Sequence, residues 1–341
     1  MHTPVAPLAL SLGDPAGIGP ELIAEAWARR EAESLPPFFI VGGASLLAQA
    51  AASRGLSVKV SNIAASAEAA SVFASALPVL GDQDAPHIPG EPTADGARLA
   101  LASLEGAVRL ALDGSAGGVV TAPIAKAELA NVGFAFPGQT EYLAAACGIA
   151  AEDAVMMLAG PSLRAVPITV HVAIADVPHM LTTDLICRRA RVVATALRRD
   201  FGIASPRLAL CGLNPHAGES GRMGREDVQV IAPAVDMLRS EGIDATGPHP
   251  ADTMFAPHKR GSYDVALAMY HDQALIPLKA LDFDSGVNVT LGLPIVRTSP
   301  DHGTAFDIAG KGIADPGAMI AAIRMAGEIA RNRARQGISG A

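Results

Sequence analysis

Three histidines follow short apolar segments of the type expected for buried strands. His171 and His271 come close behind such segments, and His216 follows one after Asn214 and Pro215. A neutral imidazole is a suitable ligand for a divalent metal, and three protein ligands leave coordination positions open for a substrate. A cation held in this way can polarise an alcohol or carbonyl oxygen and stabilise the negative charge that develops on it. Ordinary polar residues at loop mouths are the alternative, because spacing alone does not show that side chains converge.

Candidate anion-binding residues follow the third histidine. They are Lys279, Asn288 and Arg297. Lysine supplies a point charge and arginine a planar fork of donors, so together they can hold a phosphate and a carboxylate. Surface ion pairs are the alternative interpretation of the two basic residues.

Two glycine-containing segments are candidates for binding phosphate or nucleotide. Residues 13–21 join an expected strand to an expected helix, but they lack the Lys-Ser/Thr ending of a P-loop and the glycine spacing of the dinucleotide fingerprint. A tight structural turn is therefore favoured there. Residues 301–312 offer glycines for close backbone approach, together with His302 and Asp307 as hydrogen-bonding groups. Composition does not distinguish this segment from an ordinary loop that leads into a helix.

The elements that must position these residues alternate between short apolar runs and longer amphipathic runs, which predicts an α/β fold with a mainly parallel sheet. The expected strands are residues 8–12, 38–42, 118–121, 154–158, 166–172, 207–213 and 265–270. The expected helices are residues 20–30, 94–112, 184–199 and 227–240, with Pro20 in the first turn of the first and Thr183 as the N-cap of the third. Open α/β sheets bind ligands at the carboxyl ends of their strands, where the histidines are expected.

Length and composition limit the class of protein. The 341 residues are about twice the usual length of a domain, so two cores are expected. With 26 Lys and Arg against 34 Asp and Glu and no basic run, nucleic acid is an unexpected partner. Three widely spaced cysteines suit free thiols in a reducing compartment, and the N-terminus lacks an export or membrane-spanning pattern. A cytoplasmic protein with no membrane partner is expected.

Five longer strings occur in a fixed order along the chain. They are Gly-Asp-Pro-Ala-Gly-Ile-Gly-Pro-Glu (13–21), Leu-Asn-Pro-His-Ala-Gly-Glu (213–219), Ala-Asp-Thr-Met-Phe (251–255), Ala-Met-Tyr-His-Asp-Gln (268–273) and Val-Asn-Val-Thr-Leu-Gly-Leu-Pro-Ile-Val-Arg-Thr-Ser (287–299). Through these strings the chain resembles the 4-hydroxythreonine-4-phosphate dehydrogenase family over nearly its whole length. Several long motifs in one order are a specific signal.

The resemblance implies a fold of two α/β/α domains like that of isocitrate and isopropylmalate dehydrogenases, with the active site in the interdomain cleft at a homodimer interface. It places an α/β domain with the nucleotide-binding loop in residues 1–130 plus 300–341, and the metal residues, substrate residues and dimer interface in residues 131–299. The implied metal ligands are His171, His216 and His271, with one histidine donated by the second copy. The implied substrate-binding residues are Gln139, Thr140, Lys279, Asn288 and Arg297. The implied cofactor-binding residues are His302, Gly303, Thr304 and Asp307, and Lys279 and Asp252 are the candidate catalytic residues.

The activity implied by the resemblance is the NAD- or NADP-dependent oxidation of 4-phosphooxy-L-threonine, with one divalent zinc, magnesium or cobalt ion per site. The product, 2-amino-3-oxo-4-phosphooxybutanoate, decarboxylates to 3-amino-2-oxopropyl phosphate in the synthesis of pyridoxal 5'-phosphate (vitamin B6). A related metal-dependent dehydrogenase of another phosphorylated hydroxy acid or diol acid is one alternative. A phosphate acyltransferase of related fold and a metal-responsive binding protein are two more.

One position departs from the family pattern. The family commonly has Gly-His-Thr-Glu where this chain has glutamine at the second position, Gln139. A glutamine side chain keeps hydrogen-bonding capacity but cannot become cationic or shuttle a proton. Glutamine at this position is therefore expected to change either the affinity for the substrate or the choice of substrate.

Overall fold

The computed structural model describes residues 5–337 and forms two compact units. Unit 1 contains the described residues up to Ile149 and those from Leu293 onward, and unit 2 contains Ala150–Gly292. The sequence placed the corresponding crossings near residues 130 and 300. Both units combine helices with a sheet, so the mixed α/β class expected from the sequence is confirmed.

The sheet of unit 1 is entirely parallel. Its strands run in the order β3, β4, β2, β1, β5, β12. Their bounds are β1 Leu8–Ser11, β2 Phe38–Val41, β3 Val60–Ile63, β4 Leu77–Leu80, β5 Val119–Thr121 and β12 Arg297–Pro300. The central strands β1 and β5 are buried along their whole length, as parallel strands covered on both faces must be.

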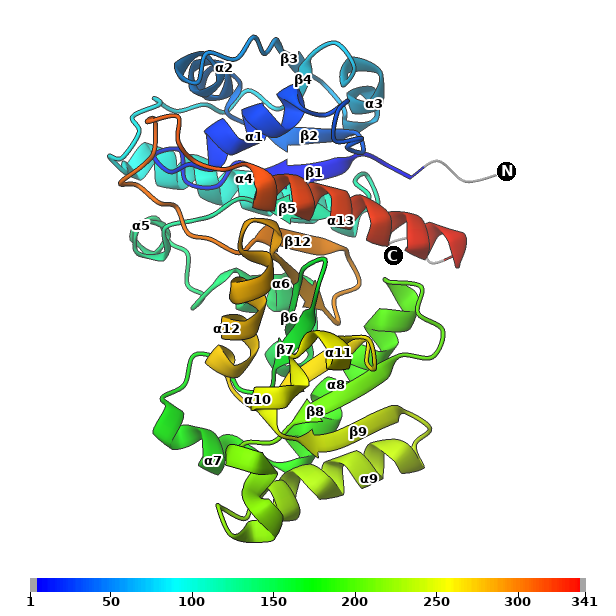
Figure 1. The fold of residues 1–341 in the computed structure, drawn as a ribbon. Helices are drawn as coiled ribbons and strands as arrows, with labels where there is room; N and C mark the ends of the chain where they lie inside the picture. The colour runs from blue at the N-terminus through cyan, green and yellow to red at the C-terminus, as the bar shows by residue number, and fades with distance from the viewer. Residues whose placement is uncertain (1–4, 338–341) are drawn as a thin grey trace. The chain divides into compact units, whose positions relative to one another are not determined.

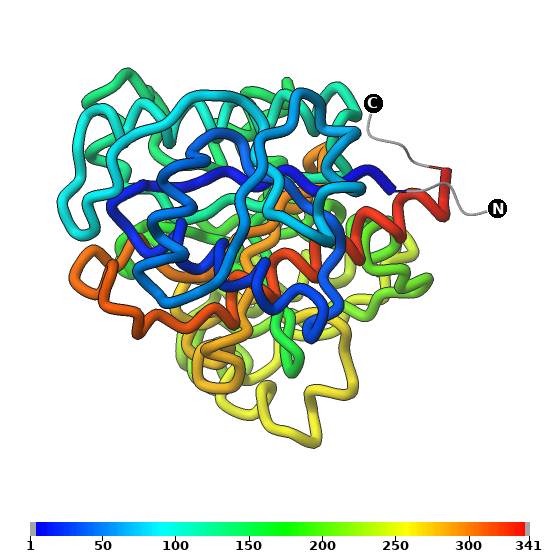
Figure 2. Tube along the Cα trace, turned by 90° about the horizontal axis from the view of Figure 1, so that it is seen from above, coloured from blue at the N-terminus to red at the C-terminus, as the bar shows by residue number. Residues whose placement is uncertain are grey.

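Helices cover both sides of this sheet. In Figure 2, α4 (cyan) and α13 (red) lie on opposite sides of β1 (dark blue), and α1 packs beside α13. The helices of unit 1 are α1 Gly19–Ala28, α2 Ala44–Ser53, α3 Ala69–Val72, α4 Ala94–Leu112, α5 Lys126–Asn131, α6 Gln139–Ala146 and α13 Gly317–Arg335, with the short turn η1 at Ser66–Glu68. Pro20 lies in the first turn of α1, as expected from the sequence.

The sheet of unit 2 mixes strand directions. Its order is β11, β6, β7, β10, β8, β9; β6 pairs antiparallel with β11 and β7, and the remaining pairs are parallel (Figure 1). The bounds are β6 Val155–Ala159, β7 Arg164–Pro167, β8 Arg207–Cys211, β9 Asp244–His249, β10 Val265–Ala268 and β11 Val287–Leu291. The parallel strands β7, β8 and β10 end on one side of the sheet, so the segments that follow them share that edge.

Unit 2 contains six α-helices, three of which are only four residues long. They are α7 Val177–Met180, α8 Thr183–Arg199, α9 Ala232–Ser240, α10 Ala251–Met254, α11 Pro257–Arg260 and α12 His271–Asp282. The short turns are η2 Ala151–Asp153, η3 Ile174–Asp176, η4 Pro215–Gly221, η5 Asp227–Ile231 and η6 Phe283–Ser285.

The expected cap of α8 was wrong by one residue. Thr182, not Thr183, is the N-cap, because its Oγ1 accepts a hydrogen bond from the backbone N–H of Leu185 at 3.1 Å. Thr183 instead donates from Oγ1 to the carbonyl of Val230 at 3.0 Å, which links α8 to the adjoining turn η5. Two adjacent threonines offer the same cap chemistry, and the tertiary contact selects between them.

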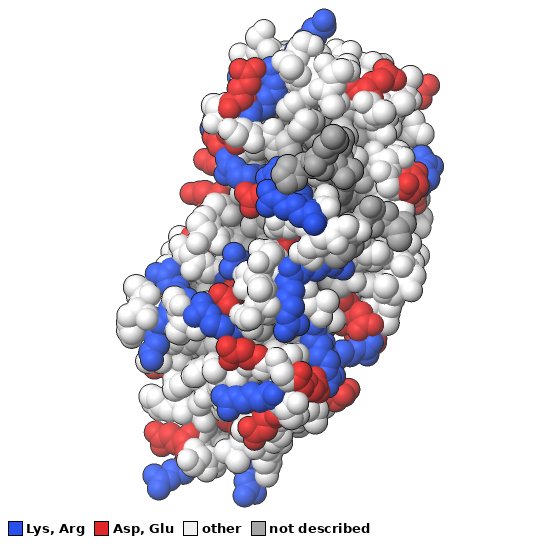
Figure 3. Space-filling view, turned by 90° about the vertical axis from the view of Figure 1, so that its right-hand side faces the viewer, with Lys and Arg blue, Asp and Glu red and all other residues white. Residues whose placement is uncertain are grey.

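Basic and acidic side chains are mixed on one face of the surface (Figure 3). On the face drawn in Figure 3, Lys and Arg side chains are interspersed with Asp and Glu side chains. Within residues 5–337, no helix combines the length and apolar character that crossing a bilayer requires.

Candidate active site

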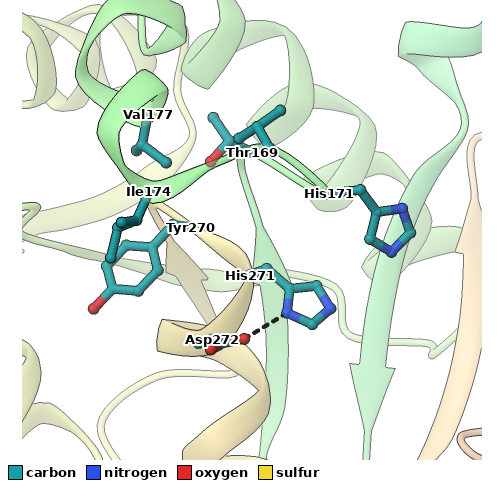
Figure 4. A pocket seen from close by; sticks show the side chains of 8 residues that line it. Thr169, His171, Ile174, Val177, Tyr270, His271 and Asp272 are labelled. Carbon is teal, nitrogen blue, oxygen red and sulfur yellow. Dashed lines mark hydrogen bonds and ion pairs between the residues drawn. The ribbon is translucent and has the colours of Figure 1, made fainter.

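Two of the three predicted histidines lie together on the wall of one cavity in unit 2. The cavity has a volume of about 240 Å³, and His171 and His271 contribute their rings to it. The two ring centroids are 5.6 Å apart, and Figure 4 shows both rings turned to the same side while Tyr270 points away. The histidines follow the neighbouring strands β7 and β10, so the expectation that polar residues gather at the strand ends is confirmed for this pair.

His271 is the first residue of α12, directly after the extended residue Tyr270. Its Nδ1 lies 2.7 Å from Oδ1 of Asp272, and this contact orients the ring with Nε2 directed elsewhere. The buried side chain of Gln273 ties the start of the same helix to two strand ends. Its Oε1 accepts from the backbone N–H of Met269 at 2.6 Å, and its Nε2 donates to the carbonyl of Gly212 at 2.8 Å.

His216 lies in η4, which follows β8, the other strand beside β10. It is exposed, and its backbone has a φ of 51°, in the left-handed region. Within residues 5–337, no three His, Cys, Asp or Glu side chains of one chain come together as a group that could hold an ion. The structure therefore brings His171 and His271 together and shows His216 on the loop of an adjacent strand.

The paired imidazoles fit a divalent metal. With metal–nitrogen distances of about 2 Å, the ring centroids of two imidazoles on one tetrahedral ion lie roughly 5 Å apart. The observed separation of 5.6 Å is close to that value. The carboxylate of Asp272 beside Nδ1 of His271 matches the usual arrangement in which a ligating histidine is oriented through its other nitrogen. The geometry of His171 and His271 is therefore compatible with two imidazoles that bind one ion.

Three further predicted residues of unit 2 lie on separate elements. Lys279 is half-buried on α12, two turns after His271. Asn288 is on β11, and its Oδ1 is buried with no hydrogen-bond partner among residues 5–337. Such an acceptor is costly unless a ligand or water satisfies it. Asp252 is exposed on α10, a short helix that packs beside η4 and therefore near the loop of His216.

Two predicted substrate-binding residues of unit 1, Arg297 and Gln139, are joined by a hydrogen bond. Arg297, the first residue of β12, is only 4% exposed, and its Nη2 donates to Oγ1 of Thr121 at 2.8 Å and to Oε1 of Gln139 at 2.7 Å. Burial lowers the pKa of the Arg297 guanidinium to about 10, so the side chain is cationic at neutral pH. Gln139 begins α6, where the half-buried Thr140 follows it. The contact with Arg297 fixes the orientation of the Gln139 amide.

The predicted nucleotide loop lies between β12 and α13 and contains no regular element. In His302, Nδ1 contacts the carbonyl of Gly303 at 3.0 Å, while Nε2 is buried without a hydrogen-bond partner among the described residues. The carbonyl of Thr304 accepts from the backbone N–H of Ile18 at 2.9 Å. Asp307 is exposed. A buried, unsatisfied ring nitrogen next to exposed glycine backbone fits a loop that receives a polar ligand.

The glycine-rich segment 13–21 supports this loop. A Cβ on Gly17 would lie 2.8 Å from the carbonyl oxygen of Thr304, so only glycine permits the approach. Asp14 is buried, and its Oδ1 accepts from the backbone N–H of Ala16 at 3.0 Å, while burial raises the pKa of the carboxyl group. These contacts agree with the interpretation of the segment as a structural turn.

Three positioning side chains were not singled out from the sequence. They are Thr121 beside Arg297, Gln273 between the strand ends, and Asp227, a fully buried carboxylate under η4. Periodicity does not identify Thr121 or Asp227, because their partners lie on other elements. Gln273 lies two residues after His271 in one of the quoted strings, and that string was the available signal.

The chain matches known proteins over most of its length. The profile of the family described as pyridoxal phosphate biosynthetic protein PdxA matches residues 34–326. A 4-hydroxythreonine-4-phosphate dehydrogenase from Erythrobacter litoralis is 62% identical, with 98% of this chain and 99% of that protein covered. The protein of that name from Zymomonas mobilis is 55% identical, with 96% of each chain covered. The crystal structure of 4-hydroxythreonine-4-phosphate dehydrogenase from Klebsiella pneumoniae superposes with a TM-score of 0.86 at 39% identity, covering 96% of this chain and 98% of that one. This chain therefore belongs to the PdxA family of pyridoxal phosphate biosynthetic proteins.

Proposed function

We propose that this chain is a dehydrogenase that oxidises 4-hydroxythreonine 4-phosphate with NAD or NADP in the synthesis of pyridoxal 5'-phosphate. Close relatives over nearly the full length are named for this activity. The observation that carries the proposal is the pair of imidazoles, His171 and His271, on one cavity wall. The product is the 3-oxo acid, which loses carbon dioxide to give 3-amino-2-oxopropyl phosphate.

The metal site of the proposed enzyme uses His171 and His271 of one chain and His216 of the partner subunit. When bound, a zinc, magnesium or cobalt ion supplies polarisation of the substrate hydroxyl, and a nicotinamide ring supplies a hydride acceptor. The carboxylate of Asp272 holds the His271 ring through Nδ1, so that Nε2 is the ligating nitrogen.

Apolar side chains around these histidines support a homodimer. Ile174 in η3 is 72% exposed, Met180 in α7 is 48% exposed, and Met223 and Val228 near η4 are 41% and 50% exposed. Exposed apolar side chains that gather in one region are typical of protein interfaces. Ile174 and Met180 follow His171 closely in the sequence, and Met223 and Val228 follow His216, so we infer that a second copy covers them. A cytoplasmic location is part of the same proposal, as expected for a biosynthetic enzyme.

The proposed contacts to the substrate anions come from five polar or charged residues. Arg297 and Lys279 supply the cationic groups for the phosphate and the carboxylate, and Asn288 supplies the unsatisfied Oδ1 as an acceptor. Gln139 and Thr140 lie at the start of α6, where a short polar side chain and an amide can contact the phosphate. Lys279 and Asp252 are the candidates for holding or moving the proton at the reacting hydroxyl.

The cofactor is assigned to the loop that contains His302, Gly303, Thr304 and Asp307. The buried Nε2 of His302 and the exposed backbone of Gly303 support this assignment. Asp307 is exposed and can accept hydrogen bonds from ribose hydroxyls. The contact of Thr304 with the turn at Ile18 keeps the loop backbone in place.

Gln139 is the one observation that favours a second candidate substrate. The family commonly has histidine there, and the Gln139 amide is held by the Arg297 guanidinium at 2.7 Å. A neutral amide donates and accepts without adding charge, so another phosphorylated hydroxy acid or diol acid is the alternative substrate. A panel of such acids, assayed with NAD and with NADP, distinguishes the two by the ratio of their kcat/KM values.

The test of the proposed function is formation of reduced cofactor by chelator-treated protein, with and without added divalent metal. We expect activity with 4-hydroxythreonine 4-phosphate to require the metal and to be lost in His271→Ala. His258→Ala changes a histidine on the exposed helix α11 and serves as the matched control, with activity retained. Full turnover of the metal-free protein would reject the metal role, and no turnover of this substrate with any metal would reject the function.

A further inference from the structure

The loop that carries His216 has an unusual backbone. Five consecutive residues, 216 to 220, have φ values between 43° and 76° and ψ values between 0° and 54°. Four of them are not glycine. A residue other than glycine is strained in the left-handed conformation, because its Cβ approaches the following carbonyl oxygen. A run of this kind persists only where surrounding contacts hold it.

Asp227 provides such contacts from beneath the turn. Its side chain is fully buried, and Oδ1 accepts from the backbone N–H of Leu213 at 2.8 Å. Oδ2 accepts from the backbone N–H of Asn214 at 3.2 Å and from Nδ2 of Asn214 at 2.8 Å. Both carboxylate oxygens therefore bind the two residues that lead into the left-handed turn.

The glycines of the segment leave room for this carboxylate. A Cβ on Gly212 would lie 2.7 Å from Oδ1 of Asp227, and a Cβ on Gly218 would lie 3.0 Å from Oδ2. The turn thus closes directly over Asp227, with one glycine before it and one within it. A larger residue at Gly212 would separate the carboxylate from the N–H groups that it accepts.

Asp227 is itself anchored to a rigid layer. It begins η5, which continues without a break into α9. The hydroxyl of Thr183 on α8 donates to the carbonyl of Val230 in the same turn at 3.0 Å. Asp227 therefore connects the strained loop to two packed helices, so its carboxylate has a fixed position from which to direct the loop.

We propose that Asp227 is a positioning residue that holds the left-handed turn and thereby presents the imidazole of His216 for metal binding. This proposal rests on the proposed function, because it takes His216 as a ligand. The strained turn directs the His216 ring toward the metal site. The hydrogen bonds to the buried Asp227 carboxylate offset part of the strain. Asp227 does not touch the metal or the substrate.

The direct test is a titration of the metal-free full-length protein with Co²⁺ alone, followed by the visible absorption of the bound ion. In Asp227→Asn an amide replaces one carboxylate oxygen, so an N–H group faces the backbone donors and the turn loses part of its anchor. Loss of a residue that orients a metal ligand typically weakens metal binding about 10–100-fold. We expect a weakening of that size and a changed absorption spectrum.

Asp264→Asn is the matched control. Asp264 also accepts a backbone N–H at an end of β8, that of Arg207 at 2.8 Å, but at the amino end of the strand, away from the histidines. Its substitution removes a comparable anchor from the same sheet and should leave the Co²⁺ affinity and spectrum unchanged. An equal loss of affinity in both variants would reduce Asp227 to a general structural role and overturn the proposal.

Two more variants separate the possible failures. If His216→Ala binds Co²⁺ as tightly as the unaltered protein, the metal role of His216 fails and with it the proposed metal site. If His216→Ala loses binding while a folded Asp227→Asn binds normally, only the present inference fails. Should Asp227→Asn not fold by circular dichroism, Asn214→Ala removes the 2.8 Å contacts of Nδ2 to both Asp227 and Glu226, and Glu226→Ala removes the second contact alone. Weaker Co²⁺ binding in Asn214→Ala than in Glu226→Ala supports the proposal, and equal binding in the two variants overturns it.

Discussion

The two units differ in where their backbone is strained. Among residues 5–337, the residues other than glycine with positive φ are Ser34 and Ala305 in unit 1 and His171, His216, Ala217, Glu219 and Ser220 in unit 2. Two of the five in unit 2 are candidate metal ligands, and the other three belong to the turn of His216. In unit 1, the candidate anion-binding group of Arg297, Thr121 and Gln139 lies on ordinary backbone and is held by side-chain hydrogen bonds.

The difference indicates two ways of fixing a functional side chain. In unit 1 the parallel sheet places Arg297 beside Thr121, because β12 pairs in parallel with β5. In unit 2 the strands end before the histidines; left-handed backbone positions His171 and His216, whereas His271 begins the helix α12. Residues with strained backbone conformations cluster at functional sites, where the conformation places a side chain for binding or catalysis. The substitutions below test whether unit 2 loses metal binding and unit 1 loses anion binding or stability.

The largest effect is expected for His171→Ala. Removal of a ligand costs more than removal of a residue that orients one, which is about 10–100-fold, so Co²⁺ affinity should fall by more than about 100-fold. A titration with Co²⁺ measures it. His179→Ala removes an exposed histidine from the nearby helix α7 and is the control. Equal Co²⁺ affinities in the two variants would show that His171 is not a metal ligand.

A smaller effect is expected for Gln139→Glu. The new carboxylate would face the buried guanidinium of Arg297 at the present 2.7 Å contact and compete with a substrate anion. A hydrogen bond to a charged group contributes about 1.5–3 kcal/mol, which corresponds to a rise in KM of roughly 10- to 100-fold. Steady-state kinetics measures it, with kcat changed less than KM.

The control for that substitution is Gln49→Glu, the same change on the exposed face of α2 in unit 1. It should leave KM unchanged. A normal KM in Gln139→Glu would show that Arg297 does not bind the substrate anion.

Ser103→Ala should affect stability alone. The hydroxyl of Ser103 is buried, accepts from the backbone N–H of Leu12 at 2.9 Å and donates to the carbonyl of Val41 at 2.6 Å. The substitution leaves two buried backbone groups without this partner, so the free energy of unfolding should fall by about 1–3 kcal/mol. Urea denaturation measures the loss, while Co²⁺ binding stays unchanged. A loss of Co²⁺ affinity would show that unit 1 also controls the metal residues.

The smallest effect is expected for Asp264→Asn. The guanidinium of Arg207 holds the pKa of the Asp264 carboxyl below its ordinary value, with further hydrogen bonding from the Arg207 backbone. A depressed carboxyl pKa contributes stability above the unfolded-state pKa, and this stability is lost as pH falls through the folded-state pKa. Because Arg207 is partly exposed, solvent screening limits the contribution to about 1 kcal/mol.

Urea denaturation at neutral pH and at acidic pH measures this contribution. The stability difference between Asp264→Asn and the unaltered protein should be present near neutral pH and shrink in acid. A difference that grows as pH falls would contradict the assignment of the ion pair.

The sequence predicted the regular elements best where one physical pattern dominates. The amphipathic run 94–112 coincides with α4, whose N-cap Thr93 accepts from Gly96 N–H. The strands β3 and β4 were missed, because β3 is polar and partly exposed and β4 contains Pro78. The helix α12 was missed because Pro277 lies inside it and predicts a break. Packing of α12 on β7 and β10 overrides that local preference.

Residue types and the five sequence motifs identified the candidate residues, but they did not predict how these residues are arranged in space. Sequence spacing indicated that His171 and His271 follow strands, and the parallel pairing of β7 with β10 places their rings together. It gave no indication of the left-handed turn at His216, because Ala217, Glu219 and Ser220 have no local preference for that conformation. Hydrogen bonds to Asp227 hold this turn, and the periodicity of the sequence does not predict such tertiary contacts.

The central claim is that imidazoles from two copies of the chain hold one metal ion at the site of oxidation. The most direct test mixes the inactive variants His171→Ala and His216→Ala under conditions of subunit exchange and measures reduction of NAD or NADP. A hybrid dimer contains one site with all three histidines, so random exchange should restore about a quarter of the unaltered activity. Hybrid dimers that form, as seen by native mass spectrometry, but restore no activity would contradict the account.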